Sequence, residues 1–192
     1  MKKLMLTAIA AGLCLGMAGT AVAQDCPESA PVAESVERPV VELALETGTV
    51  EIELRRDLAP LHVARMLTLA SECFYDGVVF HRVIEGFMAQ TGDPTGTGMG
   101  GSELPDLPAE FSDENFARGV LGMARSQDVN SGNSQFFIMY ADAPHLNNQY
   151  TAFGTVVSGM DLVDGLKKGP PSANGMVDGP DKIVTLRVKP GQ

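Results

Sequence analysis

Arg82 is the residue whose surroundings point most clearly to chemistry. It lies in an apolar run, Val78–Ile84, with the composition of a β-strand. Side chains alternate between the two faces of a strand, so Arg82 should share a face with Phe80 and Ile84. His81 should take the opposite face. A guanidinium among apolar side chains is a local conflict, and such conflicts are expected at functional sites. Apolar and amide side chains that could accompany it lie in two segments, Phe74–Pro94 and Gly119–Tyr140.

Other kinds of catalytic site find little support in the sequence. The histidines, His62, His81 and His145, are scattered, and none has a second ligand at the spacing of a metal site. The chain has no G-x-S-x-G sequence, the usual mark of a serine hydrolase elbow. Gly92–Gly101 is glycine-rich but lacks the Lys-Ser/Thr ending of a phosphate-binding loop, which favours a tightly turning loop. We therefore expect neither a metal nor a cofactor.

The elements that must position these residues are mostly short strands. A hairpin is predicted where two alternating runs, residues 41–45 and 50–54, flank the turn Thr47-Gly48. A helix should begin at Pro60 and continue to Cys73. Further strands are expected at Val78–Ile84, Val120–Arg125, Gln135–Tyr140, Phe153–Val157 and Ile183–Val188, and a second helix at Met160–Lys167. At least seven strands without regular strand–helix alternation favour a closed antiparallel barrel over a parallel sheet.

Three motifs in the predicted domain belong together. The pattern F-H-R-x-I-x-G-F-M-x-Q-x-G-D is matched from Phe80 to Asp93. The pattern G-x-x-x-M-A, followed by S-Q-F-F-I, is matched between Gly119 and Ile138, and Phe153–Met160 matches the stretch that comes next. In these segments the chain resembles the cyclophilin family of peptidyl-prolyl cis-trans isomerases. The resemblance covers roughly Val40 to Val188, and we expect one such domain over residues 40–190.

The resemblance implies both a fold and a catalytic group. The fold is mainly β, a closed eight-stranded antiparallel barrel capped by two α-helices. In the family, the guanidinium at the position of Arg82 reaches the substrate proline, and the side chain at the position of Gln90 hydrogen-bonds the substrate backbone. We expect Arg82, Gln90 and Phe87 to be the catalytic residues.

The resemblance also implies how substrate is bound. Met88, Phe137 and Leu146 should line, with Phe87, an apolar pocket for the proline ring. Ala124, Arg125 and Gln135 should edge the neighbouring groove. His81 is expected to be a structural or groove-edge hydrogen-bonding residue and not an acid–base catalyst.

These residue types suit the isomerisation of X–Pro bonds. The peptide C–N bond has partial double-bond character, with a barrier of about 18–20 kcal/mol and relaxation over roughly tens to hundreds of seconds. A hydrogen bond from Arg82 to the prolyl nitrogen would localise its lone pair and weaken that resonance. No nucleophile, metal or proton transfer is required for such a reaction.

The sequence departs from the family pattern on the pocket wall. His145 stands where the best-known members have Trp, and Tyr150 stands where a His often completes the pocket. Imidazole is smaller than indole and has a polar edge. We therefore expect both residues to contact substrate, isomerase activity to persist, and cyclosporin-type macrocycles to bind weakly.

The first 23 residues have the pattern of a secretory signal peptide. Lys2 and Lys3 precede an apolar stretch, Leu4–Met17, and Ala21-Val22-Ala23 supplies small residues before a cleavage site. The apolar stretch is short for a membrane span, so a retained anchor is the less favoured alternative. We expect cleavage after Ala23, no stable membrane anchor, and a periplasmic location, with full secretion left open.

Residues 24–39 are acidic and proline-containing, and they predict a disordered linker. The whole chain carries a net charge of −10, and loss of the two leader lysines would change it to −12. Such an acidic chain repels phosphate backbones, which argues against nucleic-acid binding. Two cysteines would remain, Cys26 and Cys73, and they could form a disulfide, stay as free thiols or pair with another molecule.

Two kinds of function are compatible with these features. The chain is either an exported enzyme, expected to be a monomer, that isomerises X–Pro bonds in unfolded or nascent polypeptides, or a holdase that only binds proline-containing segments. Arg82 favours the enzyme, because binding a proline ring requires an apolar pocket but no guanidinium.

Overall fold

The computed structural model describes residue 26 and residues 36–191. The predicted leader, its cleavage site after Ala23 and most of the predicted linker lie outside the described residues. The described chain contains strands β1 (Val40–Leu45), β2 (Gly48–Leu54), β3 (Arg82–Ile84), β4 (Met88–Thr91), β5 (Val120–Met123), β6 (Phe136–Met139), β7 (Ala152–Ser158) and β8 (Thr185–Val188). Its helices are α1 (Pro60–Ser71), α2 (Met160–Asp164) and the 3₁₀ helices η1 (Pro144–Leu146) and η2 (Pro171–Ala173).

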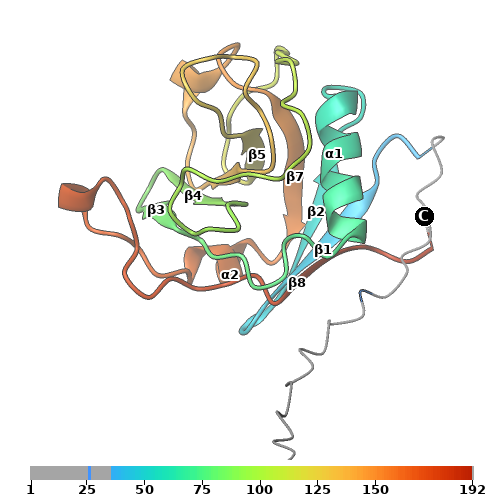
Figure 1. Ribbon diagram of the computed structural model, residues 1–192. Helices are drawn as coiled ribbons and strands as arrows, with labels where there is room; N and C mark the ends of the chain where they lie inside the picture. The colour runs from blue at the N-terminus through green and yellow to red at the C-terminus, as the bar shows by residue number, and fades with distance from the viewer. Residues whose placement is uncertain (1–25, 27–35, 192) are drawn as a thin grey trace, which may run out of the picture.

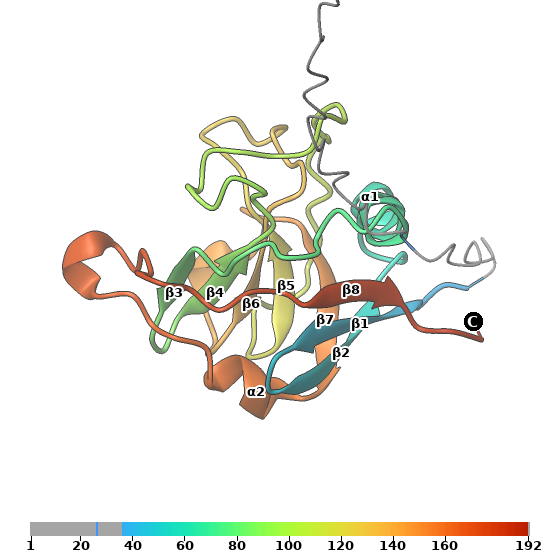
Figure 2. The ribbon, with the colours of Figure 1, turned by 60° about the horizontal axis from the view of Figure 1, so that its bottom comes forward.

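The strands form one antiparallel sheet in the order β3-β4-β6-β5-β7-β2-β1-β8. The sheet curls into a half-barrel, with α1 packed against β7 and β8 and α2 against β2 (Figures 1 and 2). The two edge strands share no ladder. The segments that precede them meet only through an isolated bridge between Val79 and Lys182 and adjoining backbone hydrogen bonds. The expectation of a closed barrel is therefore corrected to a half-barrel, because the free edge of β3 pairs with residues 175 and 176 and not with β8.

The core follows from alternation along the strands. Residues 41, 43 and 45 of β1 and residues 50, 52 and 54 of β2 point inward and are buried, while the residues between them are partly or fully exposed. A second apolar cluster lies under β4, β5 and β6 and includes Met88, Phe116, Phe137 and Leu146. This second cluster is the floor on which the functional site is built.

The largest differences from the sequence prediction concern three elements. The strand expected at Val78–Ile84 begins only at Arg82, because the backbone before it bonds to residues 181–183 instead of to a neighbouring strand. Phe80 and His81 are both buried. Phe80 packs in the main core with Val83, whereas Ile84, which shares the face of Arg82 in β3, packs on the second cluster, so the predicted sharing of one face by Phe80 and Arg82 is wrong. β4 was not predicted as a strand, and α2 ends at Asp164 instead of Lys167 because Gly165 follows it.

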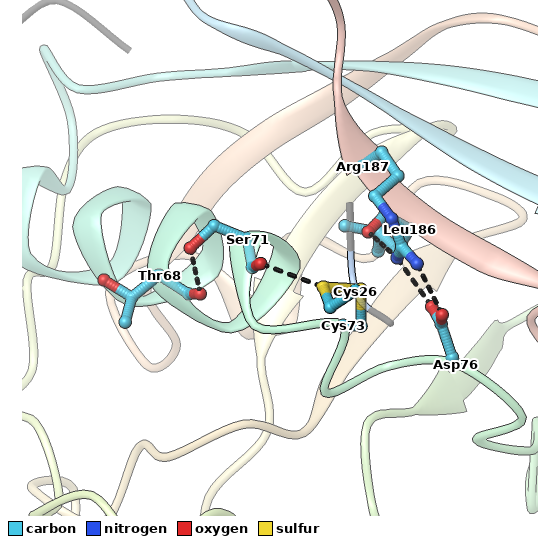
Figure 3. Close-up of a disulfide and its surroundings, with 7 residues drawn as sticks. All are labelled: Cys26, Thr68, Ser71, Cys73, Asp76, Leu186 and Arg187. Atoms are coloured by element: carbon cyan, nitrogen blue, oxygen red, sulfur yellow. Dashed lines mark hydrogen bonds and ion pairs between the residues drawn. A yellow bond between two sulfur atoms is a disulfide. The ribbon is translucent and has the colours of Figure 1, made fainter. Parts of the chain in front are cut away.

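A disulfide joins Cys26 to Cys73, with 5.8 Å between their Cα atoms. This result selects one of the three thiol states that the sequence left open. Figure 3 shows the bond just beyond the end of α1, where one sulfur lies 3.1 Å from the carbonyl oxygen of Ser71. The ion pair of Arg187 and Asp76 lies beside it. The disulfide thus attaches residue 26 to the side of the sheet that carries α1 and β8.

Candidate active site

A cavity of about 210 Å³ opens above β3, β4 and β6. A larger cavity of about 550 Å³ adjoins it and shares three of its residues, Gln90, Ala124 and Arg125. The smaller cavity is lined by Arg82, Phe87, Met88, Gln90, Ala124, Arg125, Phe137, Leu146 and Tyr150. Gln135 lines the larger cavity. The structure therefore brings together ten of the residues that the sequence singled out.

Arg82 enters the smaller cavity from β3, where it pairs in register with Gln90 of β4. Its Nη1 donates to Oε1 of Gln90 at 3.2 Å, while Nε and Nη2 donate to the backbone and side-chain oxygens of Asn174 at 2.9 and 3.2 Å. A guanidinium has five donors, so one remains on each terminal nitrogen. No ion pair within 4.0 Å involves Arg82 among the described residues. Burial lowers the pKa of Arg82, but a guanidinium stays charged at any physiological pH.

A row of amides continues from Arg82 into the larger cavity. Nε2 of Gln90 donates to Oε1 of Gln135 at 2.9 Å. Nε2 of Gln135 donates in turn to the carbonyl oxygens of Gly98 and Gly100, at 3.1 and 2.8 Å. The row fixes the orientation of the Gln90 amide. Its nitrogen donates to Gln135, so its oxygen faces Arg82.

Asp93 organises the glycine-rich loop that ends this row. Its buried carboxylate accepts hydrogen bonds from the backbone N–H and the hydroxyl of Thr95, at 2.7 and 2.8 Å, and from the N–H of Gly98 at 2.6 Å. Burial alone would raise the pKa of Asp93, but these hydrogen bonds outweigh it and lower the pKa to about 2. The loop predicted from the glycines is thus a turn built around a carboxylate.

The aromatic side of the smaller cavity depends on the close approach of the Phe137 ring to the backbone of Gly122. A Cβ atom on Gly122 of β5 would lie 2.2 Å from the ring of Phe137, so only glycine leaves room for this ring. Phe137 stacks on Phe116, with 5.9 Å between centroids, and meets Tyr150 edge-on at 5.6 Å. The guanidinium of Arg125 lies 4.5 Å from the Tyr150 centroid. Phe137 and Tyr150 therefore form a fixed aromatic surface that lines the same cavity as Arg82.

Comparison with known proteins gives a consistent picture. The chain matches the family described as "Cyclophilin type peptidyl-prolyl cis-trans isomerase/CLD" over residues 40–188. The chain belongs to the cyclophilin family. A "Probable peptidyl-prolyl cis-trans isomerase" of Brucella suis is 56% identical over 158 residues, which are 77% of this chain and 81% of that protein. The "Peptidyl-prolyl cis-trans isomerase-like 3" of Rattus norvegicus is 43% identical over 135 residues, 68% and 83% of the two chains.

Solved cyclophilin structures share the fold. A cyclophilin-type isomerase of Cryptosporidium parvum has a TM-score of 0.72 and 27% identity, covering 81% of this chain and 99% of that one. The same protein in the presence of the dipeptide Ala-Pro has a TM-score of 0.71 and 29% identity, covering 79% and 99%. A cyclophilin from Hirschia baltica has a TM-score of 0.68 and 26% identity, covering 82% and 80%. This cyclophilin is therefore a peptidyl-prolyl cis-trans isomerase.

Two of the predicted residues lie outside both cavities. His145 is exposed and stacks on Phe87, with 5.9 Å between centroids, so it extends the rim next to the smaller cavity. His81 is only 1% exposed, and neither ring nitrogen has a hydrogen-bond partner. Of the two expectations for His81, a hydrogen-bonding residue at the groove edge is wrong, because the ring is buried away from both cavities without a hydrogen-bond partner, and a structural residue is what remains. Burial also lowers the pKa of His81, which disfavours a charged imidazolium there.

Sequence reasoning missed the residues that hold the two arginines in place. Asn174 accepts two hydrogen bonds from Arg82, and the backbone oxygens of Gln149 and Ser126 accept from Arg125. The Asn174-Gly175 dipeptide is a turn signal, but nothing local indicates that the turn meets Arg82. No cluster of three metal-ligating side chains and no helix long enough to cross a membrane occurs in the described part of the chain.

Proposed function

We propose that this cyclophilin isomerises X–Pro bonds in unfolded or nascent exported polypeptides, with Arg82 as the catalytic cation. One observation carries the proposal. Arg82 lines the same cavity as the aromatic wall, keeps two donors unused, and is bonded only to neutral oxygens. A proline ring seated against Phe137 would bring its nitrogen within reach of a charged donor.

The energy required is consistent with this arrangement. Shortening a relaxation of about 100 s to about 1 ms requires about 7 kcal/mol of preferential transition-state stabilisation. A hydrogen bond to the prolyl nitrogen strengthens as the C–N bond twists, because the lone pair then becomes localised on nitrogen. A cation that is already oriented and partly desolvated incurs little reorganisation at that moment.

Replacing Arg82 tests the proposal. We expect Arg82→Ala to reduce turnover at least about 100-fold in a protease-coupled assay with an Ala-Pro peptide, because the donor to nitrogen is lost. Arg38→Ala, which removes an exposed arginine outside the cavity, is the matched control. Unchanged turnover in Arg82→Ala would refute the catalytic role. If that variant also still suppressed aggregation of an unfolded client, the groove would be a binding site only.

We also propose that the chain is exported to the periplasm and that its leader is removed after Ala23. The leader pattern supports this, and so does the Cys26–Cys73 disulfide, since such bonds persist in oxidising compartments. Intact mass spectrometry of the periplasmic fraction should find a chain that begins at Gln24, lighter by two hydrogens before reduction than after it. A full-length mass, or no change on reduction, would contradict the proposal.

The same groove should bind cyclosporin-type macrocycles weakly. His145 lies on the rim against Phe87 and leaves a small, polar-edged surface where a larger aromatic side chain would cover more of a ligand. We further propose that the protein acts as a monomer.

A further inference from the structure

A short segment, residues 169–177, runs along the outer edge of β3 and is called the strap here. Val83 exchanges backbone hydrogen bonds with it on both sides, donating to Gly175 at 2.8 Å and accepting from Gly169 at 2.9 Å. An isolated bridge pairs Arg82 with Met176. Figures 1 and 2 show the strap, with η2 at its turn, standing beside β3 at the end of the molecule farthest from the C-terminus. The strap thus covers the edge strand that carries Arg82.

Asn174 is the strap residue that faces Arg82. It ends η2 in the left-handed conformation, with φ 51° and ψ 35°, which Asn adopts more readily than most residues. This conformation presents both of its oxygens to one guanidinium. The backbone oxygen accepts from Nε at 2.9 Å and Oδ1 accepts from Nη2 at 3.2 Å.

Gln90 completes the arrangement from the other side of the guanidinium. Its Oε1 accepts from Nη1 at 3.2 Å, so all three nitrogens of Arg82 are held by neutral acceptors. Three contacts define the plane of the group and direct its two unused donors. Neutral acceptors orient the cation without cancelling its charge, whereas a carboxylate in the same place would form an ion pair and compete with the substrate.

We propose that Asn174 is a positioning residue for the isomerase reaction, holding the Arg82 guanidinium in the plane from which it reaches the prolyl nitrogen. The inference rests on the proposed role of Arg82. It predicts that the side chain of Asn174 affects the chemical step and not the binding of the proline ring, because Asn174 lines neither cavity.

Asn174→Gly is the sharpest test. Glycine accepts the left-handed backbone and keeps the carbonyl oxygen, so the substitution removes only the Oδ1 contact. We expect kcat for an Ala-Pro peptide, separated from KM by exchange NMR, to fall about fivefold while KM changes less than about twofold. Ser172→Gly, which loosens the same 3₁₀ helix at an exposed position, should leave both constants within about twofold of the parent. Circular dichroism melting should give similar transitions for the two variants.

The second arm asks whether the effect passes through Arg82. In an Arg82→Lys background, where the ammonium cannot make the three contacts, adding Asn174→Gly should lower kcat by less than about 1.5-fold further. An unchanged kcat in Asn174→Gly would overturn the inference, and so would an equal loss in Ser172→Gly or an equal further loss in the Arg82→Lys background. Full turnover in Arg82→Ala would instead refute the catalytic role of Arg82 itself, so the two failures are distinguishable.

Discussion

Arg82, Gln90 and Gln135 form a row in which each side chain fixes the next, and the row ends on the glycine-rich loop. Asp93 never enters a cavity, yet its carboxylate holds the backbone that Gln135 binds. The orientation of Arg82 therefore depends on a carboxylate that lines neither cavity. A substitution of Asp93 should therefore first reduce the stability of the glycine-rich loop.

The depressed pKa of Asp93 makes acid stability a direct measurement of this support. A carboxylate whose pKa falls from 3.8 in the unfolded chain to about 2 in the fold stabilises the folded state above pH 3.8. That contribution, about 2 kcal/mol, is lost as the pH decreases from about 4 to about 2. Urea unfolding at pH 5 and pH 2.5 should show the loss. Asp93→Asn should be less stable at pH 5 and show a shallower decrease with acid; an identical slope in both proteins would contradict the assignment.

His145 offers a second prediction at the residue scale. His145→Trp should raise the affinity for cyclosporin at least about tenfold, because indole adds apolar surface beside Phe87. Isothermal titration calorimetry measures the affinity of both proteins in the same way, and the single Trp that the variant gains provides a fluorescence signal as a second measurement on the variant. Tight binding by the parent protein would contradict the weak affinity proposed here. An unchanged affinity in the variant would show that the rim at this position does not contact the macrocycle.

The N-terminal end of α1 is completed by a residue from another part of the chain. Its N-cap, Ala59, has no side-chain hydrogen bond, and the carboxylate of Glu110 instead accepts from the N–H groups of Leu61 and His62, each at 3.1 Å. Burial lowers the pKa of His62, although Glu110 opposes the shift from 2.6 Å. The helix therefore couples the loop around Glu110 to the sheet.

The backbone at the C-terminal end of α1 is conformationally unfavourable at Cys73, and the disulfide offsets the free energy that this conformation costs. Phe74 donates to Leu69 and Cys73 donates to Ala70, the pattern of a helix end that prefers glycine, while Cys73 has φ 56°. A non-glycine residue there costs roughly 1 kcal/mol. The loop closed by the disulfide contributes up to about 4 kcal/mol through chain entropy.

Variants at Cys73 separate these two effects. Cys73→Ser and Cys73→Gly both remove the disulfide, but only glycine relieves the backbone cost. We expect both to be less stable than the parent, with Cys73→Gly more stable than Cys73→Ser by about 1 kcal/mol. Urea unfolding gives the comparison, with Cys26→Ser as a variant that should match Cys73→Ser. Equal stability of the two Cys73 variants would contradict the strain argument.

The elements divide into those that local pattern predicts and those that it does not. The hairpin β1–β2 and the helix α1 were predicted nearly to the residue, since each has a regular apolar period. The strand β4 was missed because its residues follow the turn at Gly86 directly and are too few to show a period. Asn174 and Glu110 were missed for another reason, because each acts on a residue far away in sequence, and only the curled sheet brings them into contact.

At the scale of the whole molecule, the groove contrasts with its surroundings. The chain carries 24 acidic and 14 basic residues, and several of its arginines are paired with carboxylates, among them Arg55, Arg118 and Arg187. Arg82 and Arg125 are bonded instead to neutral oxygens and both line the smaller cavity. The resemblance to the family predicted both cations, Arg82 for the proline pocket and Arg125 for the neighbouring groove, and the fold adds that Arg125 lines both cavities.

The Cys26–Cys73 disulfide and the C-terminus lie on the α1 side of the molecule, while β3 and the strap lie at the opposite end (Figures 1 and 3). The C-terminus is therefore a suitable attachment point for immobilising the protein with its groove accessible. An affinity tag, a bead or a surface coupled beyond Gly191 would attach the protein through its α1 side and leave the groove exposed to solution. Immobilised enzyme of this kind could be perfused with refolding polypeptides without its support blocking their approach.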